Sequence, residues 1–201
     1  VLAGGDKFFS IGLNLPELLE YDRRGMAEFW TLFDDTVLDL YTLPLPTACA
    51  ITGHAPAAGA ILALACDFRF AAAGPKRIGL NEIRIGVPVP YLADRMLRQV
   101  VGNCVANELE YEGKLIGMEE AKAVGLIDAI VPAEEVELRA DAQISELAAM
   151  PVAAFILTKQ HRTRDIPSQF QAIRQDLNRA FMDCWFAPAT QDLLKEAAQR
   201  F

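Results

Sequence analysis

The stretch from Thr47 to Val87 constrains the fold more than any other part of the chain. It opens with a short apolar run, Ala48–Ile51, which is typical of a fully buried strand. A break at Gly53–Pro56 and the small residues of Ala57–Ala60 then lead into Ile61–Cys66, which is compatible with a helix. Such a turn lets a ligand approach bare backbone, and the first N–H groups of a helix have no partner within it. The stretch therefore predicts either a backbone site for a developing negative charge or close packing of an alanine-rich helix.

Composition and charge exclude several classes of protein. The chain has 201 residues, of which 52% are hydrophobic and 23% charged, as expected for one globular core with a small appendage. A net charge of −8 argues against nucleic acid or an anionic membrane as partner, while a local basic pocket for a phosphorylated ligand stays open. The apolar run from Ala48 to Ala65 contains two glycines, a histidine and a proline, so we expect a buried strand, loop and helix and no membrane span.

The four cysteines are far apart in the sequence and match no metal-binding spacing. We therefore expect reduced, mostly buried thiols, no metal site and a cytoplasmic location. The chain begins directly in a strand-like segment without a methionine, which predicts that it is part of a longer polypeptide. A mitochondrial or peroxisomal matrix location therefore also stays open.

Short strands and helices alternate in the first two thirds of the chain, which predicts an α/β architecture. The expected strands cover residues 1–3, 48–51, 68–72, 77–80 and 129–131. The expected helices cover residues 22–43, 91–101, 106–109, 118–124, 134–150, 152–163, 168–186 and 191–201. We place the boundary between an α/β core, residues 1–132, and a helical region, residues 133–201, near Pro132.

Four segments in this order resemble the crotonase (enoyl-CoA hydratase/isomerase) superfamily. They are FFSIGLNL at Phe8–Leu15, AITGHAPAAGAILALACDFRFA at Ala50–Ala71, IGLNEIRIGV at Ile78–Val87 and EEAKAVGLIDAIVP at Glu119–Pro132. The resemblance implies a spiral of ββα units followed by a helical C-terminal region that forms trimers or dimers of trimers. Family members carry several strands before the first segment, and here these strands are missing.

The resemblance also implies a pair of main-chain donors. In the family, two backbone N–H groups form an oxyanion hole for an acyl-CoA thioester, and these positions correspond to Ile11 and Ala58. Here isoleucine replaces the usual alanine and alanine the usual glycine; the amides remain, although the added bulk could narrow the slot. Ser10 and Leu13, in the same segment as Ile11, are expected to contact the substrate.

One carboxylate is present where the family's hydratases use two glutamates. Ile61 occupies the first position and cannot transfer a proton, whereas Glu82 occupies the second. A lone carboxylate suits a proton shuttle from C2 to C4 of the substrate. The apolar neighbours of Glu82 in the sequence predict a raised pKa, and the alternative is a surface glutamate or one paired with Arg77 or Arg84.

Other polar residues near these segments have two interpretations each. Asn81 either orients Glu82 or caps a turn. His54 is expected to bond to backbone within its turn, and Asp67 to serve structure.

The remaining expected substrate contacts lie further along the chain. Lys159 is either a contact to the phosphates of coenzyme A or a solvated surface lysine. Tyr91, Leu92 and Met96 either line an acyl tunnel or belong to the core.

The sequence favours an isomerase of fatty acid β-oxidation that converts 3-enoyl-CoA to 2-trans-enoyl-CoA, with no metal or redox cofactor. Its pattern around Glu82 is closest to the Δ3,Δ2-enoyl-CoA isomerases. One alternative is another crotonase-type reaction, such as hydration, decarboxylation or thioester hydrolysis. A second alternative, from a different class, is a protein that binds coenzyme A or forms oligomers without catalysis.

Overall fold

Four parallel strands form the centre of the protein in the computed structural model, which describes residues 1–199. Their spatial order is β1-β2-β4-β7, and β2 pairs with β4 through Ala48↔Phe68 and Ile51↔Ala71. The strands are β1 (Leu2–Ala3), β2 (Ala48–Ile51), β4 (Phe68–Ala72) and β7 (Ala129–Val131). Strands covered on both faces read as continuous apolar runs, which explains the composition of β2; in β4 the run is interrupted by the buried Arg69.

A second, smaller sheet carries the turn that leads into the buried helix α3 (Ala58–Ala65). Its strands are β3 (Ala55–Pro56), β5 (Arg77–Gly79) and β6 (Ile116–Gly117). β3 pairs with β5 in parallel, and β5 pairs with β6 antiparallel. The expected α/β class is confirmed.

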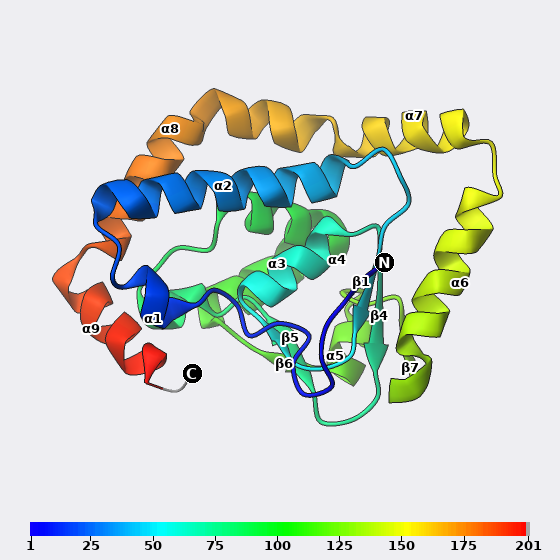
Figure 1. The fold of residues 1–201 in the computed structure, drawn as a ribbon, viewed down its shortest axis with the longest axis horizontal. Coiled ribbons are helices and arrows are strands. Elements are labelled where there is room, and N and C mark those ends of the chain that lie inside the picture. The colour runs from blue at the N-terminus through cyan, green and yellow to red at the C-terminus, as the bar shows by residue number, and fades with distance from the viewer. Residues whose placement is uncertain (200–201) are drawn as a thin grey trace.

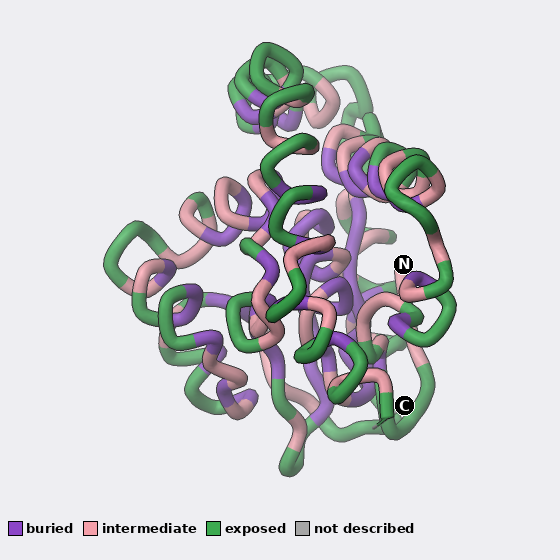
Figure 2. The backbone as a smooth tube through the Cα atoms, turned by 90° about the vertical axis from the view of Figure 1, so that its left-hand side faces the viewer, coloured by how far each residue is buried: buried purple, intermediate pink, exposed green. Residues whose placement is uncertain are grey.

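Helices surround both sheets (Figure 1). Apart from α3, they are α1 (Leu15–Leu18), α2 (Arg23–Thr42), η1 (Glu82–Ile85), α4 (Tyr91–Glu112), α5 (Met118–Ala123), η2 (Ala133–Glu135), α6 (Val136–Ala148), α7 (Val152–Thr163), α8 (Asp165–Trp185) and α9 (Pro188–Ala198). Figure 2 shows that buried backbone concentrates in the middle of the molecule, with the exposed faces of the helices outside.

Most helix boundaries differ by a few residues from those expected, and one is set by a side-chain cap. Asp22 caps α2 by accepting a hydrogen bond of 2.7 Å from the Gly25 N–H. In α4, Gly102 interrupts the helix with φ 78° and ψ 167°, as its position predicts, but the helix then resumes and extends to Glu112, beyond the expected residues 106–109. The helix expected over 134–150 is shorter, α8 and α9 each begin three residues before their expected starts, and residues 200–201 of the last expected helix lie outside the described residues.

The helices after Pro132 share their packing with the preceding part of the chain. α6 covers β2 and β4, and α8 packs against α2 and α4. Figure 1 shows α8 and α2 running side by side. The division of the chain into a core and a helical region therefore stays a prediction.

The helices and the cysteines can be compared with the expectations for a membrane span and for buried thiols. Within residues 1–199, no single helix is long and apolar enough to cross a membrane; one pair, Ala133–Ala148 with Val152–Thr163, passes by length and composition but is bent by 111°. Cys49 and Cys66 are buried free thiols, whereas Cys104 and Cys184 are exposed, so the expectation of mostly buried thiols holds for two of the four.

Candidate active site

The turn before α3 presents the start of that helix to a cavity. The Ala57 N–H donates to the Gly79 carbonyl at 2.9 Å, and Ala57 adopts φ 48° and ψ −121°. It is the only residue other than glycine with positive φ among residues 1–199. An alanine there is strained, and such strain persists where surrounding structure fixes the backbone. Ala58 follows at the first position of α3, where an N–H has no partner within the helix. Its N–H has no protein acceptor within the described part of the chain.

The segment from Ser10 to Gly12 lies directly against this helix start. Its backbone is held by the His54 carbonyl, which accepts from the Phe9 N–H at 2.9 Å and the Ser10 N–H at 3.3 Å. A Cβ placed on Gly59 would lie 2.6 Å from the Ser10 carbonyl oxygen, and one placed on Gly12 would lie 3.7 Å from the Ala58 nitrogen. The absence of a side chain at Gly59 therefore allows the close approach, whereas a Cβ on Gly12 would make only ordinary contacts.

Ile11 thus lies beside Ala58, as predicted. Its N–H, like that of Ala58, has no protein acceptor among residues 1–199. Both residues line one cavity, which also contains Leu13 and Asn81. Ser10 does not line it: its Oγ accepts from the Gly12 N–H at 3.3 Å and so stabilises the segment that carries Ile11.

Glu82 lines the same cavity from the first position of η1, and is 7% exposed. Its Oε2 has no hydrogen-bond partner, and no ion pair of Glu82 occurs within the described residues. Burial raises the pKa of the Glu82 carboxyl to about 7, against a smaller lowering by its own backbone N–H. The predicted rise of the pKa is confirmed. The alternative of a partner arginine is not observed, since the Arg84 Nε donates to the Gly113 carbonyl at 2.7 Å.

We call this space the Glu82 cavity; its volume is about 160 Å³. Its remaining walls are almost entirely apolar, and Glu82 is the only titratable side chain among its described lining residues. The lining residues that sequence reasoning did not identify come mainly from helices distant in the chain: Leu15, Trp30, Phe33, Pro56, Ala57, Ile85, Val87, Pro90, Phe181, Trp185 and Ala197. Ile61, the residue aligned above with the first glutamate of the hydratases, also lines the cavity.

The aromatic residues of the cavity wall could not be identified from the sequence, although their spacing gives a general indication of burial. Trp30 and Phe33 lie on the apolar face of α2, and Phe181 and Trp185 are four residues apart on α8. This spacing indicates a buried helix face, but it does not say which part of the core stays hollow. In the structure Trp30 stacks on Phe181 with ring centroids 3.5 Å apart.

The structure corrects the prediction that Lys159 contacts coenzyme A or lies at the surface. Its ammonium lies 2.8 Å from Asp67 Oδ2 and donates to the Leu45 carbonyl at 2.9 Å, and its side chain is 3% exposed. It is therefore neither a free contact for a phosphate nor a surface lysine. The reason is that α7 docks beside Asp67, which also accepts from the Thr47 N–H and thereby has the structural role expected of it.

Other predicted residues are distributed between core and cavity. Leu92 and Met96 belong to the main apolar core and do not line the Glu82 cavity, which corrects the expected substrate contact of Leu92. Tyr91 lines a second cavity, and its hydroxyl donates to Gln169 Oε1 at 3.2 Å. His54 Nδ1 accepts from the Arg77 N–H at 3.2 Å, as a turn histidine should.

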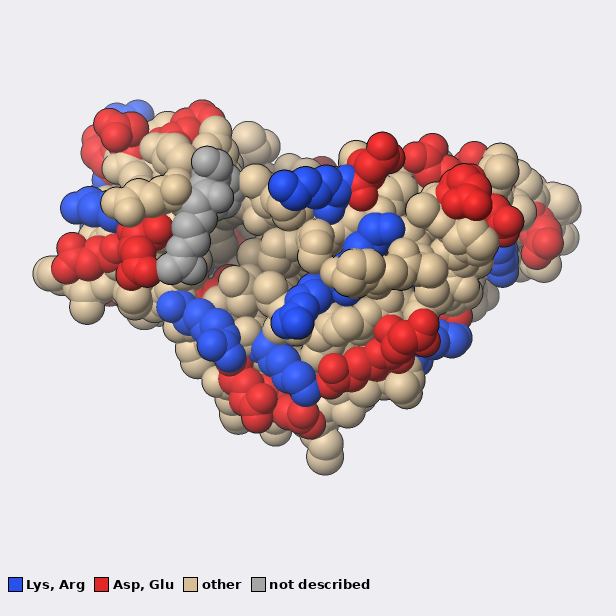
Figure 3. All heavy atoms as spheres, turned by 90° about the horizontal axis from the view of Figure 1, so that it is seen from below, with Lys and Arg blue, Asp and Glu red and all other residues tan. Residues whose placement is uncertain are grey.

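A basic area lies next to the Glu82 cavity despite the negative net charge. Arg77, Arg84 and Lys114 line a shallow depression of about 330 Å³ together with Asn81, which also lines the Glu82 cavity. Figure 3 shows several lysine and arginine side chains across the face seen from below. Within residues 1–199 no group of three or more histidine, cysteine or acidic side chains could hold a metal ion.

Comparisons with known proteins place these features in a family. The family model for enoyl-CoA hydratase/isomerase matches residues 1–198. The mitochondrial enoyl-CoA delta isomerase 1 of Mus musculus is 36% identical over 75% of this chain and 53% of its own length. A putative enoyl-CoA hydratase of Thermus thermophilus is 35% identical over 80% of this chain and 64% of its own length. The chain thus spans about half the length of the isomerase relative, and less than two thirds of the hydratase relative.

Solved structures agree with the family match. The crystal structure of human mitochondrial delta3-delta2-enoyl-CoA isomerase superposes with a TM-score of 0.93 at 30% identity, covering 98% of this chain and 76% of that one. The enoyl-CoA hydratase EchA3 of Mycobacterium ulcerans superposes with a TM-score of 0.76 at 29% identity, covering 90% and 75%. The chain therefore belongs to the enoyl-CoA hydratase/isomerase family and has the crotonase fold.

Proposed function

We propose that the protein is a Δ3,Δ2-enoyl-CoA isomerase, which moves the double bond of a 3-enoyl-CoA to give 2-trans-enoyl-CoA. The observation that carries the proposal is the composition of the Glu82 cavity: one buried carboxylate, an isoleucine at position 61 and two free main-chain donors. Addition of water requires acid and base groups on both sides of one water molecule. A single carboxylate is sufficient for a proton shuttle.

In the proposed mechanism the thioester oxygen accepts hydrogen bonds from the Ile11 and Ala58 N–H groups. The Glu82 carboxylate removes a proton from C2, and the electron pair of that C–H bond forms a dienolate whose negative charge rests on the thioester oxygen. Protonated Glu82 then delivers the proton to C4. The C3=C4 electron pair of the dienolate forms the new C4–H bond, and the C1=C2 pair becomes the C2=C3 double bond. The oxygen lone pair restores the thioester carbonyl, and no proton is gained or lost overall.

The depression lined by Arg77, Arg84 and Lys114 supports a second part of the proposal. Coenzyme A carries a 3′-phosphate and a pyrophosphate, which cations can bind. Arg77 and Arg84 have no acidic partner within the described residues, whereas Lys114 pairs with Glu120 at 2.7 Å and Lys159 with Asp67 at 2.8 Å. Asn81 lines both this depression and the Glu82 cavity. We therefore assign the phosphates of one acyl-CoA to the depression and its thioester to the Glu82 cavity.

The test is the turnover of 3-enoyl-CoA by the purified protein, followed by the absorbance of the conjugated product. Glu82→Gln should lower kcat by about 10³-fold, because it keeps the shape of the side chain and removes the base. Glu28→Gln, an exposed change on α2, is the matched control and should keep full activity. Equal turnover by Glu82→Gln would reject the mechanism.

The same preparation distinguishes the alternative reactions. Hydration of 2-enoyl-CoA, decarboxylation of a malonyl-type thioester or release of free coenzyme A, at rates above that of isomerisation, would favour another crotonase-type enzyme. Binding of acyl-CoA without deuterium exchange at C2 in heavy water would favour a non-catalytic protein.

Assembly and location form the last part of the proposal. We assign the protein to trimers or dimers of trimers, supported by the exposed apolar residues Met150, Val152 and Leu157 at and after the α6–α7 connection. Analytical ultracentrifugation of the full chain tests this assignment. Isomerase relatives named as mitochondrial support a mitochondrial matrix location over the cytoplasmic one, and imaging of the tagged full-length protein tests it.

A further inference from the structure

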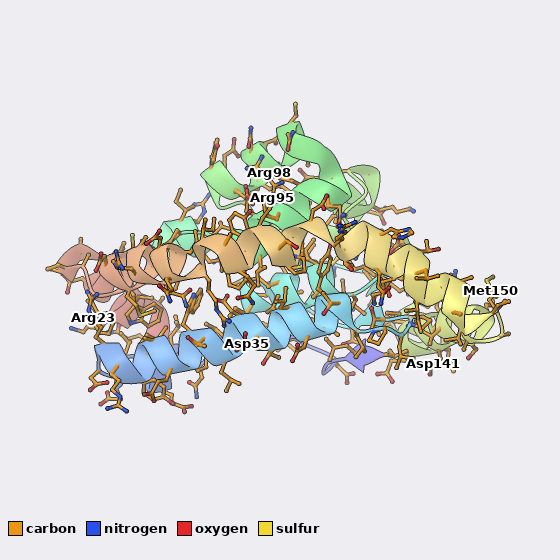
Figure 4. All side chains as sticks on the ribbon, turned by 90° about the horizontal axis from the view of Figure 1, so that it is seen from above. Arg23, Asp35, Arg95, Arg98, Asp141 and Met150 are labelled. Atoms are coloured by element: carbon orange, nitrogen blue, oxygen red, sulfur yellow. The ribbon has the colours of Figure 1, made fainter. Side chains whose placement is uncertain are left out.

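A second cavity, of about 460 Å³, lies between α2, α4 and α8. Three of its lining residues, Trp30, Pro90 and Phe181, also line the Glu82 cavity, so the two spaces share one wall. Figure 4 shows α8 between α2 and α4, with Arg98 on α4 beside α8. We call this space the Asp34 cavity.

Two carboxyl groups in the lining of this cavity are buried without sufficient partners. Asp34, on α2, is 3% exposed, and its Oδ2 has no hydrogen-bond partner. Glu110, on α4, is 4% exposed, and its Oε1 likewise has none. Burial raises the pKa of each to about 7. A buried acceptor without a donor destabilises the fold, so both oxygens indicate a ligand that supplies donors or positive charge.

The charges around the cavity exclude an anionic ligand. Arg98 is the only cationic lining residue in the described part of the chain, and each of its three guanidinium nitrogens already donates a hydrogen bond. Its Nε donates to Asp94 at 2.6 Å, its Nη1 to Asn107 at 2.7 Å and its Nη2 to Glu110 at 3.0 Å. Asp34, Asp94 and Glu110 therefore outnumber the positive charge. Arg174, outside the lining, acts on Asp34, yet burial still raises the pKa of Asp34 and of Glu110 to about 7, so the charged form of each carboxyl is under-compensated. A cation in the cavity would stabilise these charged forms, whereas an anion would disfavour them further.

The other walls are aromatic. Trp30, Tyr91, Phe170 and Phe181 all line the cavity, with Tyr91 stacked on Phe170 at 6.2 Å between ring centroids. Aromatic faces attract organic cations, and carboxylates and aromatic rings together select a positive group on an apolar body. Neither an inorganic cation, which requires several oxygen ligands, nor a neutral hydrocarbon matches this combination.

We propose that the Asp34 cavity binds an organic ammonium group, with the cation against the carboxyl groups of its lining and its alkyl part against the aromatic walls. The ammonium group has two sources in this chemistry: a free alkylamine, or the far end of an acyl chain whose thioester occupies the neighbouring Glu82 cavity. This ligand goes beyond the proposed isomerase function, because an unmodified fatty acyl chain carries no ammonium group.

Calorimetric titration of the full chain with hexylammonium chloride tests the proposal, with 1-hexanol and hexanoate as probes of equal length. Hexylammonium should bind saturably and at least tenfold more tightly than either other probe. The double variant Asp34→Asn/Glu110→Gln should weaken hexylammonium binding at least tenfold. The matched variant Asp39→Asn/Glu112→Gln, which changes exposed residues on the same two helices, should leave it unchanged. Equal affinity for 1-hexanol, or unchanged affinity in the cavity variant, overturns the proposal.

The amide variants should fold, because an amide removes the charge at each position and keeps the size. Thermal unfolding of all variants checks it.

A second measurement separates the two sources. If the ammonium belongs to the substrate, a 3-enoyl-CoA with a terminal trimethylammonium group should show a KM at least tenfold lower than its alkyl analogue, and the cavity variant should abolish the difference. Equal KM values together with saturable hexylammonium binding assign the site to a free amine. If no 3-enoyl-CoA is converted, the proposed function fails, while the titration still decides the nature of this site.

Discussion

At the scale of single residues, the proposed catalytic base is defined as much by its surroundings as by its own chemistry. Glu82 is buried, has no cationic partner within residues 1–199, and shares its cavity with Ile61. Removal from water disfavours the charged form, which brings the pKa close to neutrality. A carboxyl group with such a pKa can both accept and return a proton under the same conditions, which is what a shuttle requires.

The pH dependence of the reaction follows from this pKa. Glu82 must be deprotonated to remove the C2 proton, so kcat/KM for a 3-enoyl-CoA should rise with pH and level off above about 7. Below that value the rate should fall tenfold per pH unit. Initial rates between pH 5 and pH 9 measure the profile. A rate that stays constant down to pH 5 would mean that the carboxyl group has an ordinary pKa and is not the base.

Glu82, Ile11 and Ala58 could be predicted because they lie in short segments that resemble the motifs of the crotonase family. The sequence did not predict the position of Lys159, since four rotatable methylenes let a lysine reach several partners, and the docking of α7 beside Asp67 decides between them. The roles of Trp30 and Phe181 were equally inaccessible: both are apolar residues at helical spacing, and only packing shows that a hollow lies between them and Glu82.

At the scale of elements, the site is a junction between the N-terminal end of α3 and the segment from Ser10 to Gly12. Gly59 permits the contact, because a side chain there would overlap the Ser10 carbonyl. Strand β2 and helix α3 follow directly from their apolar and alanine-rich sequences. The junction cannot be predicted in this way, because it joins segments separated by nearly fifty residues and depends on the missing Cβ at Gly59.

Gly59→Ala tests this junction. The added Cβ would lie 2.6 Å from the Ser10 oxygen, so the segment carrying Ile11 must move away from α3. We expect the loss of one oxyanion donor to lower kcat about 10²-fold, together with a destabilisation of about 2 kcal/mol. Enzyme kinetics and urea unfolding measure the two effects. Ala60→Gly, at the next position of the same helix, controls for a general loss of helix stability, and full activity of Gly59→Ala would contradict the assigned role of the contact.

Lys159→Met tests the role of α7. Removing one partner of a buried ion pair should destabilise the fold by about 3 kcal/mol, although Arg162 continues to pair with Asp67. Urea unfolding measures this change, and titration with coenzyme A measures binding. An unchanged affinity for coenzyme A is expected, and a large loss of affinity with unchanged stability would restore Lys159 as a phosphate contact.

At the scale of the whole molecule, three buried carboxyl groups couple folding to pH. Burial raises the pKa of Glu82, Asp34 and Glu110 to about 7 each in the folded protein, whereas in the unfolded chain such groups titrate near 4. Between these values the folded protein retains protons that the unfolded chain has released. The stability that these groups contribute is therefore fully present below about pH 4 and is lost as the pH rises through about 7.

The free energy of unfolding should accordingly fall between pH 5 and pH 8. For Glu82 alone the loss is about 3 kcal/mol, and Glu82→Gln should remove that part of the slope. Urea unfolding at a series of pH values measures both proteins. A free energy that rises over this interval in the unmodified chain would show that other groups dominate the balance.

The last helix has a consequence for the order in which the protein becomes competent during translation. Glu82, Ile11 and Ala58 leave the ribosome early, yet Ala197 of α9 forms part of the cavity wall, and Leu194 of the same helix is fully buried. A nascent chain therefore carries all the reactive groups long before it encloses a substrate. A chain truncated before α9 would contain Glu82, Ile11 and Ala58 but would lack part of the cavity wall. Binding of a ligand would therefore show that translation has passed this helix.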